Sequence, residues 1–569
     1  MLRAPPRVIC PAFVFIRYID RAPYDERTAL SYCAELGYDV YLKPLLEHGA
    51  AVDEPVGKLS QTPLSYAAKN GHLSTMKLLL TSAGHVIIDR QDKSGKSGLA
   101  LAAENGHVSV VQVRNYRVRT VLRCLEQRSA HPRQHAPKLS RPALLTVYPD
   151  IQELLLNTAN IDINDDLGWT PLMRASFNGH RAVVQQLLSK GAKHHTKNKE
   201  GDSAHMLAAR EGRTSVVEIL LDNGADINSK GKEDWSALSN AAALGHLSTA
   251  TLLLDRGADV ESKGHLDDTP LMQAVKYSQH DIARLLAERG ANPNYQNSEM
   301  YTHNDFFFPR TNKAIGNNPL NKAIELGDKR MVELMIDKGA DIERKEDTHG
   351  FTPLVVAFRA NKEDIARLLI SRGADVEAKD QHGRTVLRNA AVYGCTSVIP
   401  LLLERNVDID AGEPLYEAIL RNNTNIVRML VKKGANLTNT DDLDRTPLFV
   451  AATFGYVDCV RILVENGAPL DFQNDAKETP LHIAAKHGKV GCVQVLVENG
   501  AQLEARDHKG ETPLYRAANS TSEVTKEGRR ACVLFLKERG ALVETLDDHG
   551  GSVAAKVEWL LTANLGSDA

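Results

Sequence analysis

Short apolar helices recur along the chain, and each begins with a capping residue followed by a proline. Residues 479–488 read TPLHIAAKHG, and close copies stand at 62–71 (TPLSYAAKNG) and 170–179 (TPLMRASFNG). Thr479 suits the capping position because its hydroxyl accepts a free backbone N–H of the first turn, and the proline suits the first helical position. Gly488 supplies the left-handed residue that ends the helix. Because so short a helix is not stable alone, the pattern predicts a repeated assembly.

The capping residue returns at a nearly fixed interval. Seven of the thirteen gaps between successive copies equal 33 residues, which indicates a stacked repeat. In each copy a turn with a D-x-x-G pattern precedes the short helix, and a second amphipathic helix follows, as in HRAVVQQLLSKGA at 180–192. The capping positions, which we call anchors, are Thr28, Thr62, Ser97, Thr170, Ser203, Ser236, Thr269, Asn318, Thr352, Thr385, Glu413, Thr446, Thr479 and Thr512.

The period, the T-P-L-H-x-A phrase and the L-L-x-x-G-A-D ending resemble the ankyrin repeat family over about residues 28–569. The resemblance implies an all-α solenoid, a curved rod of about 14 helix-turn-helix repeats with short β-hairpin-like turns. Helix layers about 10 Å apart would make this rod about 140 Å long. The family's histidine after T-P-L stands only at His482, so the hydrogen bonds of that histidine are in question where Tyr416 or another residue replaces it. We expect a degenerate copy near Ser552, with a closing helix at 557–561.

One insertion interrupts the regular spacing of the anchors, and it falls inside a helix. The gap between the anchors Ser97 and Thr170 is 40 residues too long, and deleting 113–152 restores both the period and a continuous second helix. This segment has seven Arg and one Lys against one Glu and one Asp, and it contains four prolines. We interpret it as a retained intron. The alternatives are a structureless surface loop and a basic arm that contacts nucleic acid or directs localisation.

Other departures from the 33-residue spacing fall in the loops that connect helices. The loop 292–316 contains three consecutive phenylalanines, which either form a contact loop or fold back on the core. Residues 520–528 lengthen the connection inside the last full repeat, and a gap of 28 shortens the turn before Glu413, which should change the local curvature. The expected organisation is a poorly ordered leader at 1–27 (with a signal peptide as the alternative), repeats at 28–112, the insertion at 113–152 and further repeats at 153–569.

Composition adds little that is specific. The net charge is −3, with 25% charged and 43% hydrophobic residues, so we expect no nucleic-acid partner. No apolar run approaches the roughly 18 residues that a membrane span needs. The seven cysteines are widely spaced and form no CxxC pair, which favours a reducing compartment. We therefore expect an intracellular, cytoplasmic protein, with the nucleus as the alternative.

The sequence contains no recognisable arrangement of catalytic residues. SGKSG at 94–98 is not a phosphate-binding loop, because Arg90 stands where that motif requires glycine. His194 and His195 are interpreted as a solvated pair and not as metal ligands. We therefore predict no enzyme activity, no cofactor, no metal and no small-molecule substrate.

Resemblance to the family implies binding at the residue before each anchor and at the last residues of each first helix. Aromatic side chains are frequent anchors of interfaces. The alternative is that an aromatic residue before the anchor packs on the next turn. The aromatic residues predicted to bind a partner are Trp169, Phe177, Trp235, Tyr277, Phe351, Tyr393 and Phe454.

These observations favour a monomeric, non-catalytic scaffold that binds other proteins through the concave face of the repeat array. One alternative is the substrate-recognition subunit of an enzyme complex such as a ubiquitin ligase. Another is association with nucleic acid through the basic insertion.

Overall fold

The computed structural model describes residues 27–82, 86–111, 160–298, 317–346, 349–519, 526–544 and 552–562. The chain divides into two compact units, Met1–Glu299 and Met300–Ala569, which are treated separately below. The insertion 113–152, nearly all of the leader and most of the loop 292–316 lie outside the described residues, as do residues 520–525. The predictions for these segments therefore remain predictions.

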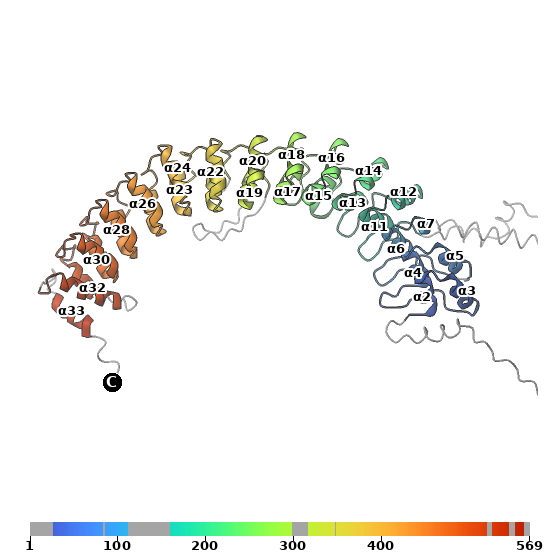
Figure 1. The fold of residues 1–569 in the computed structure, drawn as a ribbon, viewed down its shortest axis with the longest axis horizontal. Helices are drawn as coiled ribbons and strands as arrows, with labels where there is room; N and C mark the ends of the chain where they lie inside the picture. Colours follow the sequence, from blue (N-terminus) through green and yellow to red (C-terminus); the bar gives the residue numbers. More distant parts are fainter. Residues whose placement is uncertain are drawn as a thin grey trace, which may run out of the picture. The chain divides into compact units, whose positions relative to one another are not determined.

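In the first unit, short helices alternate between two rows (Figure 1). Each first helix contacts the first helices before and after it, and the second helices form the other row in the same way. The first helices are α2 (Ala29–Leu36), α4 (Pro63–Lys69), α6 (Gly98–Glu104), α11 (Pro171–Asn178), α13 (Ala204–Arg210), α15 (Ala237–Leu244) and α17 (Pro270–Lys276). The second helices are α3 (Asp39–Glu47), α5 (Leu73–Ser82), α7 (Val108–Val111), α12 (Arg181–Ser189), α14 (Thr214–Asp222), α16 (Leu247–Asp255) and α18 (His280–Glu288).

The second unit repeats this arrangement and ends with one further helix. Its first helices are α19 (Pro319–Leu326), α21 (Pro353–Arg359), α23 (Val386–Tyr393), α25 (Pro414–Leu420), α27 (Pro447–Phe454), α29 (Pro480–Lys486) and α31 (Pro513–Asn519). Its second helices are α20 (Lys329–Asp337), α22 (Glu363–Ser371), α24 (Ile399–Glu404), α26 (Thr424–Lys432), α28 (Val457–Glu465), α30 (Val490–Glu498) and α32 (Lys526–Glu538). The final helix, α33 (Val553–Thr562), contacts α31 and α32; it begins directly after Ser552 and includes the segment 557–561, where the sequence predicts a closing helix.

The predicted positions of the repeats are confirmed, because each anchor lies directly before a first helix. Thr479 shows the expected cap: its hydroxyl accepts the backbone N–H of His482, and Gly488 follows α29 with a φ of 64°. Glu413 differs from the other anchors. It has a left-handed backbone (φ 60°, ψ 49°), and like Ser203 and Thr352 it makes no capping hydrogen bond with its side chain.

The repeats on either side of the insertion pack as direct neighbours. Helix α6 contacts α11, and α7 contacts α12, although residues 112–159 separate these pairs in the sequence. The ring Nε2 of His180 lies 2.9 Å from the carbonyl oxygen of Glu104, just as Nε2 of His107 lies 2.9 Å from that of Lys69 in the preceding pair. One continuous set of repeats therefore runs through this part of the first unit.

A side chain three residues after the anchor connects adjacent repeats in two places. In His482, Nδ1 accepts the N–H of Thr479 at 3.1 Å, and Nε2 lies 3.0 Å from the carbonyl oxygen of Glu511, just before the next anchor. The hydroxyl of Tyr416 lies 2.6 Å from the equivalent carbonyl oxygen, that of Arg445. Tyr416 thus provides the connection that the loss of histidine had put in question.

Three cysteines of successive repeats are buried in the interior of the second unit without a disulfide. Cys459, Cys492 and Cys532 lie in the successive second helices α28, α30 and α32 and are fully buried. Burial raises the pKa of the Cys459 thiol to about 11 and those of Cys492 and Cys532 to about 12. Because the thiolate is the reactive form, these thiols are inert near neutral pH.

Acid is expected to destabilise the first unit through His205. This side chain is 2% exposed, its Nδ1 lies 2.9 Å from the hydroxyl of Ser203, and burial lowers its pKa to about 4. Above pH 6.5 the histidine is neutral in both the folded and the unfolded chain. As the pH falls from 6.5 to 4 only the unfolded chain takes up the proton, so the unit loses up to about 3 kcal/mol of stability.

Urea unfolding at a series of pH values measures this loss. With Trp559 replaced by phenylalanine, the remaining tryptophans, Trp169 and Trp235, both report on the first unit. A His205→Gln variant should lack most of the decline between pH 6.5 and 4. An equal decline in the variant and the parent would show that other groups cause it.

Candidate functional site

In seven of the repeats, the turn before the first helix forms a tip whose backbone is organised by one acidic or amide side chain of that turn. In the fourth repeat, Oδ1 of Asp165 accepts the N–H groups of Leu167 and Trp169, both at 2.9 Å. Backbone hydrogen bonds also join neighbouring tips, since the N–H of Asp166 donates to the carbonyl of Ser94 at 3.2 Å. The equivalent bonds elsewhere run from Lys93 to Leu59, Lys199 to Leu167, Ser298 to Leu266, Gln381 to His349 and His508 to Ala476. The tips are therefore fixed relative to their neighbours.

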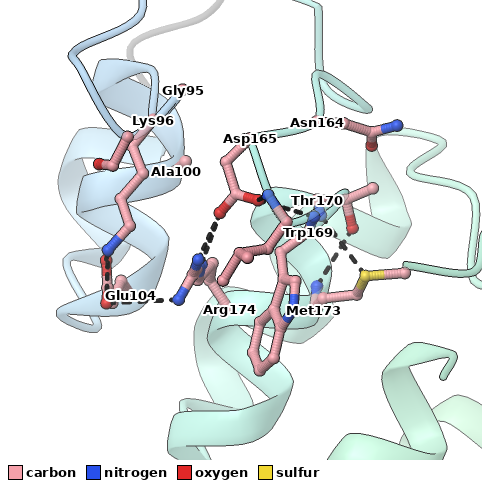
Figure 2. A network of polar contacts seen from close by, with 12 residues as sticks. Gly95, Lys96, Ala100, Glu104, Asn164, Asp165, Trp169, Thr170, Met173 and Arg174 are labelled. Atoms are coloured by element: carbon pink, nitrogen blue, oxygen red, sulfur yellow. Dashed lines mark hydrogen bonds and ion pairs between the residues drawn. The ribbon is translucent and has the colours of Figure 1, made fainter. Parts of the chain in front are cut away.

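Figure 2 shows how side chains of one tip and its helix hold each other. The guanidinium of Arg174 lies over the ring of Trp169, 4.5 Å from its centre, and Nε of Arg174 donates to Asp165 at 3.1 Å. The ring of Phe177 meets Trp169 edge-on, with 5.3 Å between the ring centres. Arg174 also approaches Glu104 of the preceding repeat at 3.7 Å. The tryptophan is thus enclosed by its own repeat.

Aromatic residues that directly precede an anchor pack against neighbouring groups. Trp169 is 9% exposed and Phe351 only 1%. Trp235 is half-buried against the next tip, where a Cβ added at Gly264 would lie 2.9 Å from Cδ1 of its indole. Trp169 and Phe351 thus present little side chain to solvent, whereas Trp235 presents part of its indole.

Aromatic residues at the end of the first helices differ in exposure. Tyr277 and Phe454 are 53% and 45% exposed. The Phe454 ring stacks on Tyr456 with 5.6 Å between the ring centres. Phe177 and Tyr393 are half-buried. Of the seven predicted residues, Tyr277 and Phe454 present the most side chain to solvent.

Sequence reasoning overlooked other exposed apolar residues at the same positions. It considered only aromatic residues, in the copies up to the anchor Thr512. The exposed residues at these helix ends that it missed are Leu36, Leu244, Leu326 and Leu420, and Trp559 is exposed within the terminal helix α33. Three further exposed leucines, Leu59, Leu167 and Leu443, lie on tips. We call the surface formed by the tips and these helix ends the first-helix face.

Charged side chains on this face form ion pairs between tips and helices. Nζ of Lys276 lies 2.6 Å from Oδ2 of Asp268. In the last full repeat, Arg516 contacts Asp507 at 2.6 Å and also reaches Glu478 of the preceding repeat at 3.0 Å. The face therefore combines exposed apolar residues with charges that are largely neutralised by neighbours.

The described residues provide no sign of metal binding or of a membrane span. Within those ranges no group of three or more His, Cys, Asp or Glu side chains could hold a metal ion. None of the helices in the same part of the chain combines the length and apolar character needed to cross a bilayer.

Comparisons with known proteins identify the repeat. A family model described as ankyrin repeats (three copies) matches residues 30–113, 145–231, 206–297, 303–380, 387–474 and 466–547. The chain is 30% identical over 167 residues to the "Ankyrin repeat and KH domain-containing protein mask-1" of Caenorhabditis elegans, a match covering 28% of this chain and 6% of that relative. A solved structure, the human ASB11 ankyrin repeat domain, is 28% identical with a TM-score of 0.34, covering 39% of this chain and 98% of that one. Residues 114–144, which the family model leaves unmatched, fall within the insertion.

Proposed function

Because the chain belongs to the ankyrin repeat family, whose repeats are generally non-catalytic protein-interaction modules, we propose that it is a scaffold that binds partner proteins through its first-helix face. The observation that carries this proposal is the recurrence of exposed apolar side chains at first-helix ends. Repeated exposure of large apolar groups at equivalent positions is typical of an interaction surface.

The arrangement of the repeats supports binding over several repeats. Leu244 and Tyr277 end the first helices of adjacent repeats, so they lie on one continuous strip of surface. Backbone bonds between tips and ion pairs between repeats order this surface before a partner arrives, which lowers the entropic cost of association. We further propose that the protein acts as a monomer in the cytoplasm. The described cysteines, which are all unpaired, are consistent with a reducing compartment.

A double variant, Leu244→Ser with Tyr277→Ser, tests the proposal. Loss of these two exposed apolar side chains should reduce the amount of captured partner at least about tenfold. Each apolar side chain that contacts a partner contributes roughly 1 kcal/mol or more to the binding free energy. The measurement is affinity capture of the full chain from its native cells, with proteins quantified by mass spectrometry.

The matched control is Leu534→Ser with Leu542→Ser, which removes two exposed leucines outside the first-helix face. Thermal unfolding of both variants should match that of the parent, since all four side chains are exposed. Retention of partners by the first variant, or equal loss in both, would contradict binding through the first-helix face.

A further inference from the structure

The eleventh repeat lacks the tip that its neighbours have. Nine residues, 405–413, connect α24 to α25, whereas fourteen, 433–446, connect α26 to α27. The tenth repeat closes its tip with a hydrogen bond from the N–H of Asp380 to the carbonyl of Arg384, at 3.0 Å. The twelfth repeat closes its own in the same way, between Asp441 and Arg445 at 3.1 Å. Two complete tips thus flank a repeat that has none.

The missing tip leaves the third residue after the preceding anchor partly exposed, with the short turn at Gly412 lying against the stem of its side chain. That residue is Arg388, whose side chain is 26% exposed. In the other thirteen repeats with anchors from Thr28 to Thr512, the equivalent residue is described and buried, whereas in the terminal copy at Ser552 it is the exposed Ala555. The buried equivalents are Ser31, Ser65, Ala100, Met173, Met206, Ser239, Met272, Asn321, Val355, Tyr416, Phe449, His482 and Tyr515.

Arg388 has more hydrogen-bond donors than the described chain uses. In two other repeats the side chain three residues after the anchor, His482 or Tyr416, forms a hydrogen bond with the backbone carbonyl of the residue just before the next anchor. Arg388 instead makes one ion pair, from Nη2 to Glu417 Oε1 at 2.7 Å, while its Nε is buried without a hydrogen-bond partner among the described residues. A guanidinium carries five N–H donors, and its fork matches a carboxylate.

We propose that an extended segment of a partner protein takes the place of the missing tip and that one of its carboxylates binds Arg388. Helix layers lie about 10 Å apart and paired strands about 4.8 Å apart, so an extended chain is narrow enough to occupy the layer of one repeat beside the flanking tips. The nearby carboxylates of Glu413 and Glu417 disfavour a strongly acidic segment. The segment therefore carries a single aspartate or glutamate among neutral residues. This inference rests on the proposed scaffold function and specifies one binding position within it.

Random peptides displayed on phage provide the probe. Peptides are selected on the full chain and depleted on an Arg388→Met variant, since methionine occupies this position in three other repeats. The selected peptides should share one aspartate or glutamate. Their affinity, measured by fluorescence anisotropy, should fall at least about tenfold for Arg388→Met and when the peptide carboxylate is changed to the amide.

A second variant restores the tip without changing Arg388. Residues 439–446 are copied in place of residues 411–413, which returns the repeat to 33 residues. This variant should also lose the peptides, whereas a control variant, Arg428→Met, which changes an exposed arginine of the second helix α26, should bind them like the parent. Circular dichroism and thermal unfolding establish that each variant is folded.

Two results would overturn the inference. One is selection of peptides without a shared carboxylate, or of peptides that the restored-tip variant still binds. The other is peptide binding that arises only after deletion of residues 300–315, which would assign the position to this chain's own segment. The scaffold proposal is judged separately, because its test uses native partners and variants at Leu244 and Tyr277.

Discussion

Replacing Leu430 with alanine is expected to lower the free energy of unfolding of the second unit by about 3 kcal/mol. This side chain lies in α26 and is fully buried, so truncation removes apolar contact and leaves a cavity that the surrounding helices fill only in part. Urea unfolding followed by circular dichroism measures the loss. Leu420→Ala is the control, because the exposed Leu420 should change stability by no more than about 0.5 kcal/mol.

The repeat architecture also predicts which helices lose stability in the Leu430→Ala variant. Each first or second helix contacts mainly its neighbours, so stability is close to a sum of local terms. Amide hydrogen exchange in Leu430→Ala should accelerate most in α24, α26 and α28, while α12, α14 and α16 of the first unit keep their protection. Uniform acceleration across both units would contradict this local description.

Gly95→Ala is expected to cost about 3 kcal/mol, because the third and fourth tips touch at this glycine. Gly95 has a φ of 74°, and an added Cβ would lie 2.4 Å from the backbone nitrogen of Asp166. The left-handed conformation alone costs alanine about 1–2 kcal/mol, and forcing two backbones apart adds roughly 1–3 kcal/mol. Tryptophan fluorescence during urea unfolding of the first unit, in the Trp559→Phe background, measures the change.

Gly257→Ala separates the cost of the left-handed backbone conformation from the cost of forcing two backbones apart. Gly257 has a φ of 85° but no atom within 4 Å of its added Cβ, so this variant carries only the conformational cost. Equal destabilisation by the two substitutions would mean that the tips on either side of the insertion do not meet. A larger cost at Gly95 supports one continuous array across residues 112–159.

Local signals made the repeat predictable from sequence. A capping residue such as Thr479, the proline after it and the closing Gly488 act within a few residues of one another. Their spacing therefore placed the first helices correctly. The buried faces followed from helical periodicity, which is also a local property.

The candidate site was less predictable, because exposure depends on neighbouring repeats. Trp169 is covered by Arg174 and Phe177, and Trp235 lies against the next tip at Gly264. The contacts of Trp169 lie within its own repeat but depend on how its tip folds against α11, whereas the contact of Trp235 requires the next repeat. The partial exposure of Arg388 likewise depends on the next repeat, whose connection is too short to form a tip.

The bonds that join successive tips use backbone N–H and carbonyl groups, as between Asp166 and Ser94. Any amino acid except proline can supply the donor. Most side chains at the tips can consequently diverge during evolution while the architecture persists. Recognition of new partners can thus be acquired by point mutation, one tip at a time, without renewed selection for folding.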